Sequence, residues 1–196
     1  MSKSDPAAAK KERNKTIRWV VTIFFVTMLV SGTISLLSDY IMSVAGIAVA
    51  FIILLAIILV GILFDIIGVA VASADEKPFH SMASRKVPGA QNAIRLLRNA
   101  ERVSSICNDV IGDICGIISG SAAATIAAQI ILHVDLGWAR LITLAMSAAV
   151  AALTVGGKAM GKTFAMNSCI PILSFVGRFL YYLQHPAAVF RQKRKK

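Results

Sequence analysis

Acidic residues are scarce in this chain. Its 196 residues contain 10 Asp and Glu against 21 Lys and Arg, which gives a formal net charge of +11. Only 16% of the residues are charged and 57% are hydrophobic, with a mean hydropathy of +0.72. Several apolar runs without charge are about as long as a bilayer is thick. This composition excludes an ordinary soluble domain and predicts a single-domain integral membrane protein.

Cysteine pairs and catalytic motifs are also lacking. The three cysteines are Cys107, Cys115 and Cys169, and none forms a C-x-x-C pair. The first two lie eight residues apart on one expected helix, a rise of about 12 Å, which is too long for a disulfide. The sequence has no paired Cys/His cluster, no Gly-rich phosphate loop, and no nucleophile with a base at a recognisable spacing. We therefore predict a protein that is not an enzyme.

Four apolar runs predict an all-α protein with about four transmembrane helices. Basic residues gather before the first run, between the second and third runs, and at the C-terminal end, whereas the other two connections carry few. By the positive-inside rule, both termini are cytoplasmic and the number of spans is even. The predicted location is the inner or plasma membrane, crossed several times. The expected spans are residues 17–38, 41–64, 103–133 and 139–157.

The remaining segments are expected at the cytoplasmic side. Pro88 precedes apolar residues spaced by three and four, which predicts a basic amphipathic helix in the second connection. Lys158 and Lys162 follow the fourth span one turn apart, where snorkelling and the helix dipole favour cations. We expect a flexible basic tail at 1–16, a helical membrane domain at 17–185 and a basic tail at 186–196. Besides its four spans, this domain is expected to contain a continuation of the second span at 66–74 that re-enters or lies along the membrane, an amphipathic connection at 75–102 and an interfacial helix at 163–183.

The positive charge has an explanation other than nucleic acid. In a soluble protein a net charge of +11 would suggest a nucleic-acid partner. Here the basic residues flank the predicted spans, so they orient the chain and attract anionic lipid. We therefore expect the lipid bilayer as partner, anionic lipid at the basic cytoplasmic faces, and no nucleic acid.

The third predicted span is unusually polar. Asn108, Asp109 and Asp113 lie in its first half, although ionisable groups are costly inside a bilayer and usually face a bundle interior, an ion path or an opposite charge. Asp65 is the single ionisable residue between residues 41 and 74, and we weigh an interfacial position evenly against a polar core. Together with Lys158 these residues form the predicted polar core. Small residues at four-residue spacing predict a helix-packing groove beside it: Gly112, Gly116 and Gly120.

A succession of short motifs suggests a family. An apolar helix is followed by a basic connection that ends in a Leu-Leu-x-Asn-x-Glu-Arg sequence. An Ile-Gly-polar triplet, a Gly-Lys-x-x-x-Lys-Thr sequence and a helix containing a proline come after it. The stretches are 65–75, 96–102, 111–113, 157–163 and the surroundings of Pro171. In order and approximate spacing over residues 50–185, they resemble the transmembrane domain of the cyclin-M / CorB–CorC family of magnesium transport proteins, without its nucleotide-binding regulatory domains.

The resemblance implies a magnesium site and a homodimer. The family's ion-binding positions match Asp65 or Ile67, then Asp113, then Lys158, so Asp113 and Asp65 are the predicted ligands of a Mg²⁺ ion. Lys158 stands where the family has an acid. This ammonium could pair with Asp65, Asp109 or Asp113 in place of the metal, and it would repel a divalent cation.

Two functions therefore follow from the sequence. One is a membrane protein related to divalent cation transporters, with a role in cation transport or homeostasis. The other is a non-transporting membrane scaffold that retains the fold and has a Lys–Asp pair in place of the ion. A contact between Lys158 and an aspartate favours the second function, whereas aspartates that converge on an open cavity, with Lys158 turned away, favour the first.

Overall fold

The computed structural model describes residues 6–44, 46–132 and 137–184. These residues form helices joined by short turns, with no strand among them. Four helical stretches are long and apolar enough to cross a membrane, namely Lys15–Ser38, Ile47–Ser73, Ala100–Ile131 and Ala139–Asn167. The predicted all-α membrane architecture with four spans is confirmed at this level.

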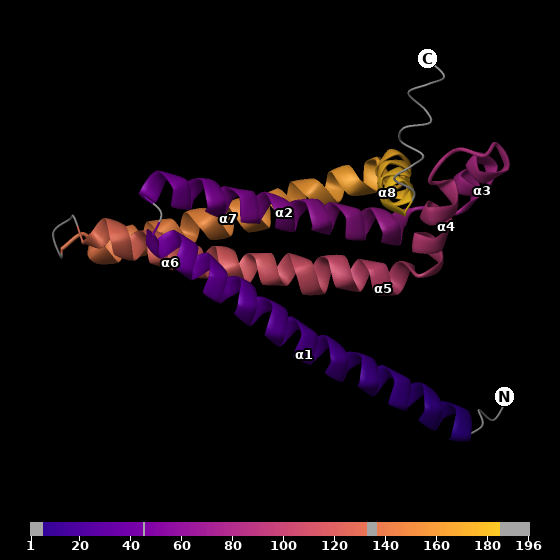
Figure 1. Cartoon of the computed structure of the whole chain (residues 1–196), viewed down its shortest axis with the longest axis horizontal. Coiled ribbons are helices and arrows are strands. Elements are labelled where there is room, and N and C mark those ends of the chain that lie inside the picture. The colour runs from indigo at the N-terminus through magenta and orange to yellow at the C-terminus, as the bar shows by residue number, and fades with distance from the viewer. Residues whose placement is uncertain (1–5, 45, 133–136, 185–196) are drawn as a thin grey trace, which may run out of the picture.

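Figure 1 shows how the helices are arranged. The long helices lie side by side, with the short ones gathered at one end of the bundle. The structure gives the long helices as α1 (Pro6–Val44), α2 (Ile47–Ser73), α5 (Ala100–Ser105), which continues through a π-helical segment η1 (Ile106–Gly112) into α6 (Asp113–Ile131), and α7 (Ala139–Asn167). The short helices are α3 (Lys77–Ser84), α4 (Ala90–Arg98) and α8 (Cys169–Gln184).

Three boundaries differ from the predicted ones. Helix α1 begins at Pro6, so the backbone is helical over most of the segment predicted as a flexible tail. Helix α2 runs without interruption to Ser73, so residues 66–73 continue the helix of the second predicted span. Helix α7 continues to Asn167, ten residues past its predicted end, because its glycines serve as contact points for another helix. The predicted tail at 186–196 lies outside the described residues.

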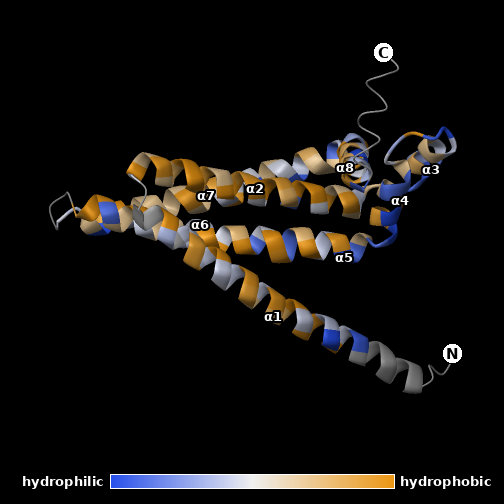
Figure 2. Ribbon diagram, viewed as in Figure 1, coloured by the Kyte–Doolittle hydropathy of each residue, from blue (hydrophilic) through white to orange (hydrophobic). Residues whose placement is uncertain are grey.

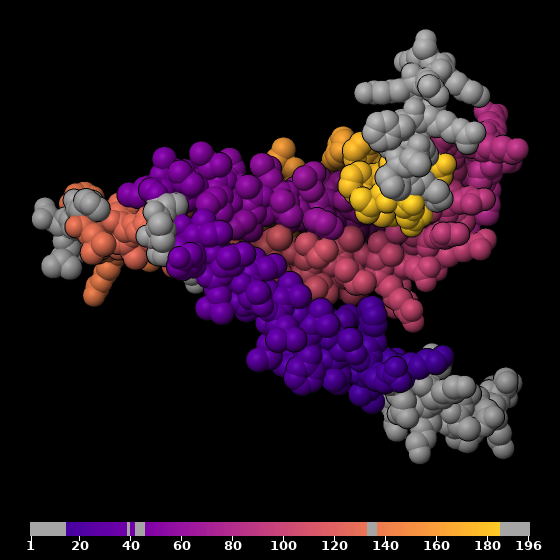
Figure 3. Space-filling model, viewed as in Figure 1, coloured from indigo at the N-terminus to yellow at the C-terminus, as the bar shows by residue number. Residues whose placement is uncertain are grey.

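Helix α2 is the centre of the bundle. It packs against α5, η1 and α6 on one side and against α7 on the other, and it also contacts α8. Apolar residues dominate the long helices, and polar residues gather on α3 and α4 (Figure 2). Helix α1 contacts α6 but diverges from the rest of the bundle toward its N-terminal end (Figures 1 and 3). Helix α1 contributes no residue to the buried apolar core in the described part of the chain, whereas α2 contributes residues to both of its clusters.

Two separate apolar clusters form the core. The first joins the N-terminal half of α2 to α6 and α7, and consists of Ala50, Leu54, Ile58, Ala122, Ala123, Ile126 and Val150. The second joins the C-terminal end of α2 to the short helices and the end of α7, and consists of Ala70, Val71, Phe79, Ala93, Ile94, Leu97, Ala165 and Leu173. Between the two, α2 carries the buried Asp65. A polar layer at Asp65 therefore separates the two apolar clusters along α2.

Candidate functional site

The polar layer begins with one face of α2. Gly61, Asp65 and Gly68 are spaced by four and three residues, so they lie on the same side of the helix. All three are buried. The two glycines are points of close approach between helices: a Cβ on Gly61 would lie 2.8 Å from the Cβ of Cys115, and a Cβ on Gly68 would overlap the amide oxygen of Asn108. Asp65 therefore lies between two close contacts of α2 with the helix that carries Asn108 and Cys115.

The helix that faces α2 here is the continuous η1–α6 helix, and it runs antiparallel to α2. Asn108 lies opposite Gly68, Gly112 lies near Asp65, and Cys115 lies opposite Gly61. A π-helical segment, Ile106–Gly112, covers the first part of this face. Such segments are rare, occur mostly as single turns inside α-helices, and are frequent at functional sites. The predicted polar stretch therefore contains a local change of helix geometry next to Asp65.

Helix α7 brings a cation to the same layer. Gly161 approaches α2 so closely that a Cβ there would lie 2.9 Å from Ile66 Cγ1, and a Cβ on Gly157 would overlap Ile62 Cδ1. Lys158 lies between these contacts on α7. Small residues allow helices to pack at short distance in membrane proteins, so the ammonium of Lys158 can reach across to α2 and η1.

The ammonium lies between two carboxylates. Lys158 Nζ is 3.9 Å from Oδ1 of Asp65 and 3.9 Å from Oδ1 of Asp113. It donates a hydrogen bond of 3.2 Å to the backbone carbonyl of Gly112. The side chain of Asp65 is 5% exposed and that of Lys158 20%, whereas that of Asp113 is 69% exposed. The buried partner of the lysine is therefore Asp65, and Asp113 closes the site from the exposed side.

The site has more acceptors than donors. Two carboxylates face one ammonium, which has three N–H groups. Among the described residues, the second carboxylate oxygen of Asp65 and the amide oxygen of Asn108 are buried without a hydrogen-bond partner. Asn108 itself donates a bond of 3.2 Å to the hydroxyl of Ser104. Unpaired buried acceptors are costly, so these two oxygens favour a further donor or a cation nearby.

The layer lies well inside the helices. Asp65 and Lys158 are each five residues from the midpoint of their helix, a rise of about 7 to 8 Å. Both midpoints lie inside the hydrocarbon core if these helices cross a membrane symmetrically. A charge at that depth needs a partner within the protein. The Lys158 contacts supply one for Asp65.

The structure brings together most of the predicted polar residues. Asp65, Asn108, Asp113 and Lys158 form one layer around Gly112, whereas Asp109 is exposed and does not pair with the lysine. Asp65 is 3% exposed and thus lies inside the helix bundle.

Of the three glycines in the predicted packing groove, Gly112, Gly116 and Gly120, only the first lies close to other residues in the described part of the chain. Gly112 is in contact with Lys158 and Asp65, but a Cβ added to Gly116 or Gly120 would meet nothing within 4 Å. No group of three or more His, Cys, Asp or Glu side chains arranged to hold a metal occurs in the described part of the chain.

Several residues of the site were not predicted from the sequence. Ser104, Gly61 and Gly68 were missed, as was the π-helical segment. The spacing of the two α2 glycines around Asp65 was a usable signal, because a small–charged–small stripe marks a face that another helix approaches closely. The π-helix had no comparable signal in the residues.

Comparison with known proteins identified no relative of this chain. No protein-family model, curated protein or solved structure matches this chain. The resemblance to the cyclin-M / CorB–CorC family therefore depends on the succession of motifs in the sequence and stays a prediction.

Proposed function

We propose that this chain is a non-transporting membrane scaffold, in which the ammonium of Lys158 occupies the place of a bound metal ion. The observation that carries the proposal is the position of Lys158 Nζ, 3.9 Å from both Asp65 and Asp113 and 3.2 Å from the carbonyl of Gly112. A tethered ammonium neutralises the buried carboxylate. It also repels a divalent cation at the same place, because the like charges would lie only a few ångströms apart.

The proposed setting is the cytoplasmic (inner or plasma) membrane. The basic residues favour both termini and the α3–α4–α8 end on the cytoplasmic side. Anionic lipid is the expected partner of that end. A homodimer is also part of the proposal: Gly116 and Gly120 have open space beside them, and Asp113 is exposed at membrane depth, where a second copy would shield it from lipid.

The test is magnesium binding by the purified full chain. Isothermal titration calorimetry with Mg²⁺ should give no saturable heat for the wild type. Lys158→Glu replaces the ammonium by a third carboxylate and should create binding; because Asp65 loses its counter-ion in this variant, helix content is checked by circular dichroism with and without Mg²⁺. Lys162→Glu is the matched control, because Lys162 is one turn further along α7 and exposed. Saturable binding by the wild type would contradict the scaffold proposal.

A second candidate function is divalent cation transport. It is favoured by the surplus of acceptors, since the second oxygen of Asp65 and the amide oxygen of Asn108 lack partners among the described residues. In this proposal Lys158 moves aside and a hydrated Mg²⁺, here the transported substrate, takes its place beside Asp65 and Asp113. Magnesium flux in proteoliposomes is the measurement. Flux that is lost in Asp113→Ala would support transport, whereas absence of wild-type flux supports the scaffold.

A further inference from the structure

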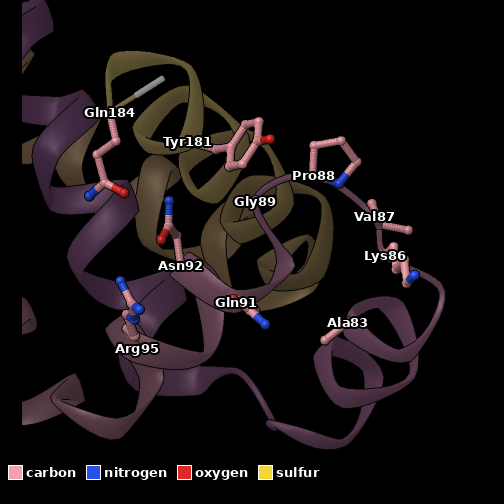
Figure 4. Close-up of a pocket in the computed structure, with 10 residues that line it drawn as sticks. All are labelled: Ala83, Lys86, Val87, Pro88, Gly89, Gln91, Asn92, Arg95, Tyr181 and Gln184. Atoms are coloured by element: carbon pink, nitrogen blue, oxygen red, sulfur yellow. The ribbon is translucent and has the colours of Figure 1, made fainter. Parts of the chain in front are cut away.

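A second polar region lies at the α3–α4–α8 end, away from the Lys158 layer. It is a cavity of about 290 Å³ between the turn after α3, the start of α4 and the end of α8 (Figure 4). This volume is near the lower limit for small-ligand pockets, about 300 Å³. The cavity can therefore hold a small polar group rather than a long apolar molecule.

The backbone that forms the cavity is tightly fixed. Lys86 and Gly89 both have positive φ angles, 56° and 89°, so the chain turns sharply before α4. Gly89 lies directly against the backbone of α8: a Cβ there would overlap the backbone N of Arg178, and a Cβ on Gly177 would lie 2.6 Å from the carbonyl oxygen of Gly89. The crossing of two glycines brings α4 and α8 together at short distance. Residues on either side of this crossing line the cavity.

A buried amide in the cavity lacks an acceptor. Asn92 is 8% exposed, and no described residue accepts a hydrogen bond from its Nδ2. Figure 4 shows the Asn92 amide directed into the space between Tyr181, Gln184 and Arg95. A buried donor without an acceptor is destabilising. The arrangement thus favours a ligand that brings acceptor oxygens.

The charges around the cavity have one sign. Lys86 and Arg95 line it, and no Asp or Glu is among the residues that do so in the described part of the chain. Helix α4 starts at the cavity, and no side chain caps its first turn. Backbone N–H groups and the helix dipole make such an N-terminus favourable for an anion. The buried Asn92 amide and the two cations indicate the same class of ligand independently.

We propose that this cavity binds a phosphate group, carried by a phospholipid headgroup or by a small soluble phosphate. A phosphate offers several acceptor oxygens at once, which matches the Asn92 amide, the start of α4 and the guanidinium of Arg95. The opposite side of α8 carries Phe175 and Phe179, which are 73% and 59% exposed and suited to lipid tails. The cavity would then lie near the headgroup layer. This proposal does not depend on the role of Lys158.

The experiment measures phosphate binding to the full chain in dodecyl maltoside micelles, which contain no phosphate. Potassium phosphate is titrated calorimetrically against a potassium chloride blank of equal ionic strength, which removes general screening effects. The wild type should bind saturably. Arg95→Gln should weaken binding by about tenfold or more, because a charge-assisted hydrogen bond is lost. Arg98→Gln is the matched control: it removes the same charge one turn away, where the guanidinium is 66% exposed and 4.0 Å from Glu76.

A second arm identifies the source of the phosphate. Wild type and Arg95→Gln are purified from membranes supplemented with phosphatidic acid, and the retained lipid is quantified. Retention by the wild type and loss in Arg95→Gln assign a headgroup, whereas calorimetric binding without retention assigns a soluble phosphate. Asn92→Asp, checked for helix content by circular dichroism, should abolish both signals by like-charge repulsion. The proposal is overturned if the wild type shows neither signal, or if Arg98→Gln weakens binding as much as Arg95→Gln.

Discussion

The Lys158 layer and the cavity at the start of α4 differ in whether the chain itself supplies a partner for their buried polar groups. In the Lys158 layer, a buried carboxylate is matched by a cation from the same chain, held by closely packed glycines of α2 and α7. In the cavity at the start of α4, cations and a buried amide surround a space that the described chain leaves without an acceptor. The comparison indicates that the first region holds a cation of its own, although two of its acceptor oxygens lack partners, whereas the second region is suited to a group brought from outside.

Removing the internal cation should give the largest effect. Lys158→Met leaves the nearly buried Asp65 without its counter-ion, and the expected loss of unfolding free energy is about 3–5 kcal/mol. Lys162→Met, on the exposed side of α7, should change it by no more than about 0.5 kcal/mol. The measurement is reversible unfolding in mixed micelles. The double variant Asp65→Leu/Lys158→Met should recover most of the loss, since buried pairs often stabilise little compared with apolar residues. If Lys158→Met and Lys162→Met lowered the free energy of unfolding equally, Lys158 would not be the counter-ion of Asp65, and the two polar regions would no longer differ in this respect.

Crowding the helix contact beside Asp65 should give an intermediate effect. Gly68→Ala places a Cβ against the Asn108 amide, and overpacking of this kind costs about 1–3 kcal/mol. Gly116→Ala is the control, because nothing lies within 4 Å of its added Cβ, and alanine favours the helix slightly. Unfolding in the same micelles compares the two. If Gly116→Ala is as harmful as Gly68→Ala, a neighbour outside the described residues fills that part of the groove, as a homodimer would.

Replacing the buried amide should give the smallest effect on stability. Asn92→Leu removes a donor that has no acceptor, so in phosphate-free buffer the free energy of unfolding should stay within about 1 kcal/mol of the wild type. Added phosphate should then raise the unfolding midpoint of the wild type but not that of Asn92→Leu. A large destabilisation without phosphate would show that the amide has a structural partner, and the contrast with the Lys158 layer would weaken.

The helices themselves were largely predictable from the sequence. Long apolar runs with few charges define the four spans, and the periodic apolar residues after Pro88 predict α4. Their ends were less accurate. The fourth span was predicted to end at residue 157, yet α7 continues to Asn167, and Gly157 marks a close approach of α2 instead of a stop.

The residues of the polar core could be predicted from the sequence, but the contacts among them could not. Asp65, Asp113 and Lys158 stood out because charges are rare in apolar runs. Which carboxylate is buried depends on how α2, η1 and α7 are rotated, and no spacing within a single helix contains that information. The cavity at α4 was not predicted at all, because its residues come from segments about 90 positions apart, and only the fold brings Asn92 near Tyr181.

The position of Lys158 has an electrical consequence. If the four helices cross a membrane as we propose, the chain holds a positive charge about 7 to 8 Å from the middle of the bilayer, roughly half way to the edge of the hydrocarbon core. This charge is tethered to the backbone and donates a hydrogen bond to the carbonyl of Gly112. Such a tether does the work of a mobile counter-ion, because the buried carboxylate of Asp65 keeps a partner without any ion having to enter the bundle from solution. Since buried pairs are screened much less than exposed ones, the contact should persist when the ionic strength outside the membrane changes.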